Sequence, residues 1–273
     1  MSPAGGAPAE PKQAATVLLL RDGRQGLEVY LLRRTKGMPF AGGMTAYPGG
    51  GVDPRDGDTE IGWAGPSPAD WATAFGCDER TARELVCAAV RETFEEAGVL
   101  LAGPADGAGV GGVVPSVSGD DWEEQRQALL SRELSLAELL ADRGLVLRSD
   151  LLRPFAHWIT PPVEPRRYDT KFFAAALPVG QEARDVSGEA DEASWLTPAA
   201  ALAELTGGSR PMLPPTSHTL GQLQRFPDVA AALAGSPPQP LEPISPRFEE
   251  NADGRWAVLP DGTRIRLVMP LPS

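Results

Sequence analysis

The stretch Arg91-Glu92-Thr93-Phe94-Glu95-Glu96-Ala97-Gly98 places three glutamates within five positions. In a helix, at about 100° per residue, Glu92, Glu95 and Glu96 fall within an arc of roughly 100°. Apolar residues occupy the opposite face: Val86, Val90, Phe94 and Ala97. Convergent carboxylates repel one another unless a cation lies among them, and Mg²⁺ prefers such oxygen ligands. An ordinary solvated acidic face is the alternative interpretation.

A glycine-rich turn precedes this helix in the sequence. Tyr47-Pro48-Gly49-Gly50-Gly51-Val52-Asp53 follows a short strand-like stretch. Proline fixes one backbone dihedral, and glycine permits positive φ and close approach of the backbone to a ligand. Such a turn can fold under a metal-bound phosphate, so Gly49, Gly50 and Gly51 are candidate substrate-binding residues.

Together, the turn and the helix resemble the signature of the Nudix hydrolase superfamily, G-x5-E-x7-R-E-x2-E-E-x-G. Gly50 takes the first position, and the later positions are Arg91, Glu92, Glu95, Glu96 and Gly98. The resemblance implies an α/β (α+β) fold, namely an α/β/α sandwich with a mixed sheet and extra helices from insertions. It also implies that Glu92, Glu95 and Glu96 are catalytic and hold Mg²⁺, with Mn²⁺ as a possible substitute.

Two features depart from that signature. Asp56 stands where the first glutamate is expected, and residues 57–90 separate it from Arg91, where seven residues are usual. An interrupted box resembles the subgroup that includes the animal peroxisomal coenzyme A diphosphatases. The role of the first glutamate stays open at this point, because Glu79 or Glu84 on the extended helix could replace Asp56.

Two further roles follow from the pattern and the resemblance. We hypothesise that Arg91 orients a glutamate through a charge-assisted hydrogen bond, Glu95 lying one turn away; a surface ion pair is the alternative. In the superfamily a later loop often supplies a general base. Glu189 and Glu192 precede a predicted strand and are the candidates, with solvated loop carboxylates as the alternative.

Two groups of cations could hold substrate phosphates. Arg166, Arg167 and Lys171 form the most concentrated positive group of an acidic chain. Arg33 and Arg34 lie at the end of a predicted strand, before the glycine turn. Pairing with neighbouring carboxylates is the alternative for the first group.

The resemblance implies an Mg²⁺-dependent hydrolase that cleaves a pyrophosphate bond in a nucleoside diphosphate linked to another moiety, by attack of an activated water at phosphorus. Coenzyme A-type substrates, sugar nucleotides and dinucleotides remain open. Coenzyme A diphosphatases typically carry an arginine four residues ahead of a glycine, but here Pro39 holds that position before Gly43. A non-catalytic nucleotide-binding or regulatory module on the same fold is the alternative.

Composition narrows the partners. The chain has 273 residues, 42% of them hydrophobic, and a net charge of −12, which argues against binding a nucleic acid polymer. Apolar runs of 18 residues and a signal pattern are both missing, so we expect a cytoplasmic protein that does not bind membranes. The expected partner is a small-molecule diphosphate, and a homodimer is possible because homodimers are frequent in the superfamily.

The domain organisation is predicted in three parts. Residues 1–13 form a disordered tail. Residues 14–206 form the Nudix domain, with an insertion at about 57–90 and a helical elaboration at about 120–145. Residues 207–273 form helices and a terminal hairpin packed on the same domain. Within the main domain, Asp78 and Gly98 are expected to cap the long helix, and a strand is expected at 99–102.

Overall fold

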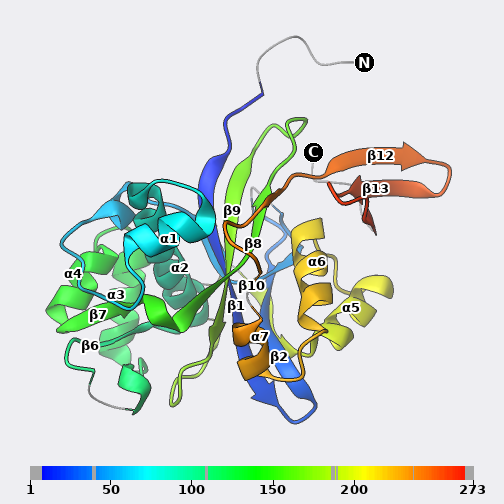
Figure 1. The fold of residues 1–273 in the computed structure, drawn as a ribbon. Helices are drawn as coiled ribbons and strands as arrows, with labels where there is room; N and C mark the ends of the chain where they lie inside the picture. Colours follow the sequence, from blue (N-terminus) through cyan, green and yellow to red (C-terminus); the bar gives the residue numbers. More distant parts are fainter. Residues whose placement is uncertain are drawn as a thin grey trace.

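The computed structural model describes residues 8–38, 41–107, 110–185, 188, 190–235 and 237–267. A mixed sheet runs through the middle of the molecule, with α1–α4 on one side and α5–α7 on the other (Figure 1). This three-layer arrangement confirms the α/β/α sandwich that the sequence predicts. In the described residues, no helix is long and apolar enough to cross a membrane.

The main sheet has the strand order β10-β2-β1-β9-β8-β11, with β3 beside β2 and β4 beside β1. Its strands are β1 (Lys12–Gly23), β2 (Gly26–Arg34), β3 (Thr45–Ala46), β4 (Gly49–Gly51), β8 (Leu152–Ile159), β9 (Tyr168–Ala176), β10 (Ala190–Leu196) and β11 (Pro243–Ile244). β1 and β9 are parallel, as are β8 and β11, and the other pairs are antiparallel.

Helices cover both faces of the sheet. They are α1 (Pro68–Phe75), α2 (Glu79–Ala97), α3 (Asp120–Leu130), α4 (Leu136–Asp142), α5 (Pro198–Thr206), α6 (Pro214–Leu223) and α7 (Val229–Ala234). Asp78 caps α2 by accepting a hydrogen bond from the backbone N–H of Thr81, and Gly98 ends it at φ 63°. These caps confirm the predicted ends of the long helix.

Each face of the sheet packs on its own helices. Along β1, Val17 and Leu19 are buried with α1 and α2, whereas Leu18 and Leu20 are buried with α6 and α7. This alternation is the period of two expected for a strand buried on both faces. The side chains of β1 therefore divide between an α2 side and an α6 side, which fixes where functional groups can point.

The glycine turn lies where β1 and β2 separate. β2 pairs with β1 only over Leu20–Gly23, as far as the described residues go, and β4 takes its place beside Ala14–Thr16. β3 pairs with the end of β2. The segment 45–51 thus fills the gap between the two strands. Gly49–Gly51 therefore lie at a point that both faces of the sheet share.

Two smaller sheets complete the fold. One is built from β5 (Trp63–Ala64), β6 (Ala102–Pro104) and β7 (Leu145–Arg148), and the other from β12 (Arg247–Asn251), β13 (Gly254–Val258) and β14 (Arg264–Arg266). β12 and β13 project from the body beside α6 (Figure 1).

Some predicted boundaries are wrong. The strand expected at 99–102 begins only at Ala102, because the backbone N–H and carbonyl of Leu100 are hydrogen-bonded to the Gln181 side chain and the ladder with β7 covers Ala102–Pro104. β1 begins at Lys12 because the backbone N–H of Lys12 donates to the Arg167 carbonyl, so the last two residues of the expected tail are strand. Residues 1–7 lie outside the described part of the chain.

A buried charged cluster lies under α1, on the α2 side of the sheet. Asp169 Oδ1 lies 2.6 Å from His157 Nε2 and 2.7 Å from Lys171 Nζ, and Lys171 is 3% exposed. Burial alone would raise the pKa of Asp169, but the hydrogen bonds from His157 and Lys171 hold that pKa well below its ordinary value. Lys171, one of the candidate phosphate ligands, is therefore used in the core.

We expect Asp169→Asn to lower the free energy of unfolding at pH 7 by about 3 kcal/mol, because it leaves a buried ammonium unpaired. The pKa of Asp169 is depressed in the folded state, so its contribution is present above the unfolded value of about 3.9 and fades as the pH falls below it. Urea unfolding at pH 7 and pH 3 should show a gap between variant and wild type that narrows in acid. The exposed Asp253→Asn is the control, and an equal gap at both pH values would contradict the assignment.

Candidate active site

The acidic face of α2 gathers around one arginine. Arg91 Nη1 donates to Glu92 Oε1 at 2.8 Å and to Glu95 Oε2 at 3.0 Å. Its Nη2 donates to the Gly51 carbonyl at 3.0 Å. Arg91, Glu95 and Glu96 are 6–8% exposed. The predicted contact between Arg91 and Glu95 is therefore present, and it is a buried network of four acceptors, not a surface pair.

Asp56 is the fourth acceptor. Its Oδ1 accepts a hydrogen bond from Arg91 Nε at 3.0 Å, and its Oδ2 accepts one from Arg91 Nη2 at 2.9 Å. Oδ2 also accepts a hydrogen bond from the Asp53 backbone N–H. A short 3-10 turn, Pro54–Gly57, holds the carboxylate in place. By contrast, Glu79 is exposed, and Glu84 lies against Gly57 and accepts a hydrogen bond from Arg80. Of the three alternatives, Asp56 is the one in contact with the arginine of the box.

The glycine turn contacts the same glutamates. The Gly49 backbone N–H donates to Glu96 Oε2 at 2.8 Å, and Arg34 Nη1 lies 3.7 Å from Glu96 Oε1. Burial and the neighbouring charge of Glu92 raise the pKa of Glu95 to about 7, against the lowering effect of Arg91. The cluster thus holds more negative charge than its one central arginine balances.

A divalent cation suits this donor set. Glu92, Glu95 and Glu96 offer the carboxylate oxygens that hard cations prefer, and the cluster carries surplus negative charge. In the described part of the chain, however, no group of three or more His, Cys, Asp or Glu side chains is arranged to hold a metal ion, because Glu92 and Glu95 point their oxygens at Arg91. Metal binding by these three residues stays a prediction.

Close packing explains two of the three glycines. A Cβ on Gly50 would lie 2.5 Å from Glu92 Oε1, and a Cβ on Gly49 would lie 2.5 Å from the Ala15 carbonyl. On Gly51 the nearest atom would be 4.0 Å away, the Gln13 carbonyl. Gly50 is therefore needed for the contact between turn and helix, and Gly49 for the pairing of the turn with β1, whereas Gly51 has room for a side chain.

We expect Gly50→Ala to reduce the rate of diphosphate hydrolysis at least about tenfold, because the methyl group displaces the Glu92 carboxylate. Misplacing a catalytic group by 1 Å can lower a rate about a hundredfold. The φ angle of Gly50 is not positive, so the fold should survive, and circular dichroism checks this. Gly37→Ala, where a Cβ meets no atom within 4 Å, is the control. Equal rates for both variants would contradict the packing argument.

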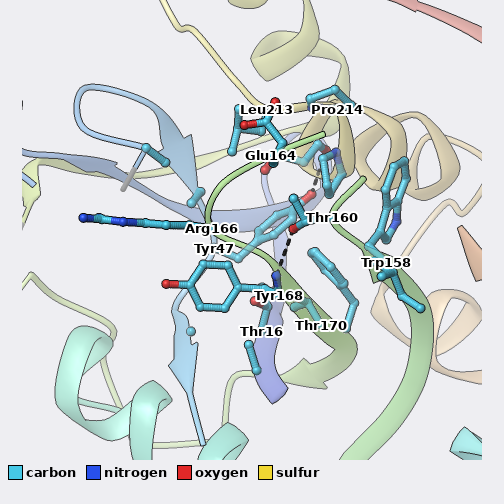
Figure 2. Close-up of a pocket in the computed structure, with 18 of the residues that line it drawn as sticks. Thr16, Tyr47, Trp158, Thr160, Glu164, Arg166, Tyr168, Thr170, Leu213 and Pro214 are labelled. Atoms are coloured by element: carbon cyan, nitrogen blue, oxygen red, sulfur yellow. Dashed lines mark hydrogen bonds between the residues drawn. The ribbon is translucent and has the colours of Figure 1, made fainter. Parts of the chain in front are cut away.

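A cavity of about 360 Å³ opens on the α6 side of the glycine turn. Gly49–Gly51 and Arg34 line it. Of these residues, Gly50 lies against Glu92, and Gly49 and Arg34 lie beside Glu96. Thr16, Tyr168 and Thr170 form its floor on β1 and β9, and Trp158 lies on β8 (Figure 2). A ligand in the cavity can therefore extend past the turn to the carboxylates of α2.

The predicted cations are divided by the structure. Arg166 lines the cavity at its rim and is exposed. Arg167 instead donates to the backbone carbonyls of Thr160 and Ala9. Arg33 is turned to Glu192, 4.0 Å away, and it is the neighbouring Arg34 that lines the cavity. Adjacent residues of β2 point to opposite faces. Arg34 follows Leu32 on the α2 face and lies beside Glu96, whereas Arg33 follows Leu31 on the α6 face and lies beside Glu192. Arg34 reaches the cavity where β1 and β2 have separated.

Of the two candidate bases, Glu192 lies within the described residues. Glu189 lies outside the described residues, as does Pro39. Glu192 accepts a hydrogen bond from Arg210 at 2.6 Å and does not line the cavity. It therefore fits an ion pair at the sheet edge better than a base.

One positioning contact gave no signal in the sequence. Arg126 of α3 is 1% exposed, and its Nη1 donates to the backbone carbonyl of Glu95 at 2.9 Å. Glu123, on the same helix, accepts from Arg126 Nε at 2.9 Å. The helical elaboration thus braces the last turn of α2. A charged residue in a helix that looks exposed reveals such a role only once the helix is placed.

Comparisons with known proteins identify the family of the chain. The model of the NUDT19 Nudix domain matches residues 77–223. Acyl-coenzyme A diphosphatase NUDT19 of Xenopus laevis is 28% identical over 152 residues, which cover 52% of this chain and 39% of that protein's length. The crystal structure of a NUDIX hydrolase from Alicyclobacillus acidocaldarius aligns with a TM-score of 0.67 and 28% identity, over 84% of this chain and 97% of that one.

Proposed function

Because the chain belongs to the NUDT19 Nudix domain family, we propose that it hydrolyses the diphosphate bond of acyl-coenzyme A or a closely related coenzyme A thioester. One observation carries the proposal: Gly49–Gly51 line the cavity, and Gly49 and Gly50 also contact Glu96 and Glu92 of α2. A diphosphate that crosses this turn has one arm in the cavity and its phosphates beside the carboxylates. The family relationship favours coenzyme A over sugar nucleotides and dinucleotides.

Each residue of the site has its own role in the proposed reaction. Gly49 and Gly50 let the diphosphate approach because they carry no Cβ. Arg34 faces the cavity next to Glu96 and can bind a phosphate oxygen. Arg91, fixed by Asp56, orients Glu92 and Glu95. Water attacks one phosphorus, the bond from that phosphorus to the bridging oxygen breaks, and the second phosphate leaves with that oxygen. Glu92 is our candidate to take the proton of the water.

Glu92, Glu95 and Glu96 would hold Mg²⁺ or Mn²⁺. When bound, such an ion neutralises charge on the diphosphate and lowers the pKa of water. The alternative function, a nucleotide-binding module without turnover, is disfavoured because the buried carboxylates and Arg91 are all in place in one network.

A substrate panel tests the proposal. Acyl-coenzyme A, coenzyme A, a sugar nucleotide and a dinucleotide are incubated with the protein and Mg²⁺, and products are separated by chromatography. We expect adenosine 3′,5′-bisphosphate and the acylated phosphopantetheine to accumulate fastest, from acyl-coenzyme A. Binding without products would favour the regulatory module, and faster cleavage of the sugar nucleotide would contradict the substrate assignment.

A further inference from the structure

We propose that the cavity holds the acyl end of the substrate, and that Pro246 and Phe248 form the wall that sets how long an acyl chain is accepted. This inference rests on the proposed function. It assigns a role in specificity to the C-terminal region, in which the sequence carries no motif.

The lining of the cavity is mostly apolar and comes from distant parts of the chain. Tyr47 and Trp158 lie on the α6 side of the sheet, and Leu213 and Pro214 begin α6 (Figure 2). Pro246 precedes β12 and Phe248 lies on it. The wall opposite the sheet is therefore built from α6 and β12.

Two hydroxyl groups of this lining are hydrogen-bonded within the protein, whereas the buried Trp158 Nε1 has no hydrogen-bond partner among the described residues. The Tyr47 hydroxyl lies 3.2 Å from the Thr216 carbonyl and 2.9 Å from Thr219 Oγ1. Thr160 Oγ1 accepts the Tyr168 backbone N–H at 3.1 Å. Among the described lining residues, the charged ones are Arg34, Glu164 and Arg166. Arg34 lies beside Glu96, where the diphosphate is expected, and Arg166 lies at the rim.

This chemistry selects between the two arms of the substrate. The nucleotide arm carries a base, a ribose and an additional phosphate, and these need several hydrogen-bond donors and a cation cluster. The thioester arm ends in a hydrocarbon chain, which needs only apolar contacts. The lining is mostly apolar, and its two arginines lie at the turn and at the rim, so the acyl end is the better occupant.

The wall at β12 belongs to this chain beyond the matched family domain. The family model ends at residue 223, before Pro246 and Phe248. Pro246 is buried and Phe248 is half-buried. β12 pairs only with β13 in the described residues, as part of the small sheet that projects from the body (Figure 1). The position of this wall can therefore change without disturbing the catalytic helix.

The expected signature is a dependence on chain length. Burying each methylene contributes about fourfold in affinity. In the wild type, kcat/KM should rise by up to that factor per methylene from acetyl- to longer acyl-coenzyme A, and then stop rising when the chain reaches Phe248. Coenzyme A itself has no acyl chain, so its turnover serves as the internal check on folding and catalysis.

The test measures kcat/KM for coenzyme A and a series of saturated acyl-coenzyme A thioesters. In Phe248→Ala the acyl chain length that gives the highest kcat/KM should increase by two or more methylenes. The turnover of coenzyme A should stay within about twofold of the wild-type value. Phe248→Leu should give a smaller shift and guards against loss of folding in the alanine variant. Phe226→Ala is the matched control, because Phe226 is also a half-buried C-terminal phenylalanine but packs among α6 and α7 residues outside the cavity.

The outcomes separate this inference from the proposed function. A uniform rise of KM for all thioesters and for coenzyme A would show that the cavity holds the shared nucleotide or pantetheine part, and would overturn the inference alone. An unchanged length profile in Phe248→Ala would also overturn it. If the wild type hydrolyses none of these compounds, the proposed function itself fails.

Discussion

Replacing Glu96 by glutamine should lower kcat for diphosphate hydrolysis at least about a hundredfold. Removing an outer-shell partner of a metal site already costs about ten- to a hundredfold, and a ligand should cost more. Glutamine keeps an oxygen that can accept the Gly49 N–H, now at 2.8 Å from Glu96 Oε2, so the turn should stay in place. Glu95→Gln should have an effect of similar size. Steady-state rates with Mg²⁺, together with melting temperatures, measure both variants.

Glu79→Gln is the matched control for these variants. Glu79 lies on the same helix but is exposed in its first turn, so the substitution removes the same charge away from the glycine turn. Its rate should match that of the wild type. If Glu96→Gln and Glu79→Gln were equally active, the acidic face of α2 would not be the site of hydrolysis.

Replacing Arg91 by alanine should give the largest loss of stability among the site variants, about 3–5 kcal/mol in the free energy of unfolding. The substitution leaves Asp56, Glu92 and Glu95 buried without their shared cation. Burial alone would lower the pKa of Arg91, but these carboxylates hold it above its ordinary value, so the arginine stays charged in the wild type. Activity should be lost with the orientation of the glutamates.

Arg91→Lys and Arg80→Ala define what the arginine contributes. Lysine keeps the charge but cannot donate to both Asp56 oxygens and two glutamates in one plane, so it should recover part of the stability and little of the activity. Arg80 is 80% exposed in an i,i+4 pair with Glu84, and its removal should change the melting temperature little. An Arg91→Ala protein as stable as Arg80→Ala would show that the network does not hold the fold together.

The helix and its caps could be predicted because they depend on local chemistry. Asp78 and Gly98 mark the ends of α2 in the sequence, and the spacing of Glu92, Glu95 and Glu96 fixes their common face. The contact of Glu96 with Gly49 spans 47 residues. That contact was expected because the signature joins the two segments. The local helix or turn propensity of either segment alone does not predict it.

Other parts of the site depend on how distant strands are placed. Arg34 lies on the α2 face of β2, beside Glu96, and it lines the cavity only because β1 and β2 have separated at that point. The choice of Asp56 over Glu84 needs the path of the insertion, which returns the 3-10 turn to Arg91. β7 and β12 are short strands that pair with other short strands. They therefore lack the long apolar alternation that marks β1 and β2.

The central claim is that a diphosphate lying across the Gly49–Gly51 turn is cleaved beside the glutamates of α2. The most direct test follows the products of acyl-coenzyme A with Mg²⁺ for the wild type, Glu96→Gln and Glu79→Gln in parallel. We expect adenosine 3′,5′-bisphosphate to form at equal rates with the wild type and Glu79→Gln, and at least about a hundredfold more slowly with Glu96→Gln. Equal release of this product by all three proteins, or by none of them, would contradict the account.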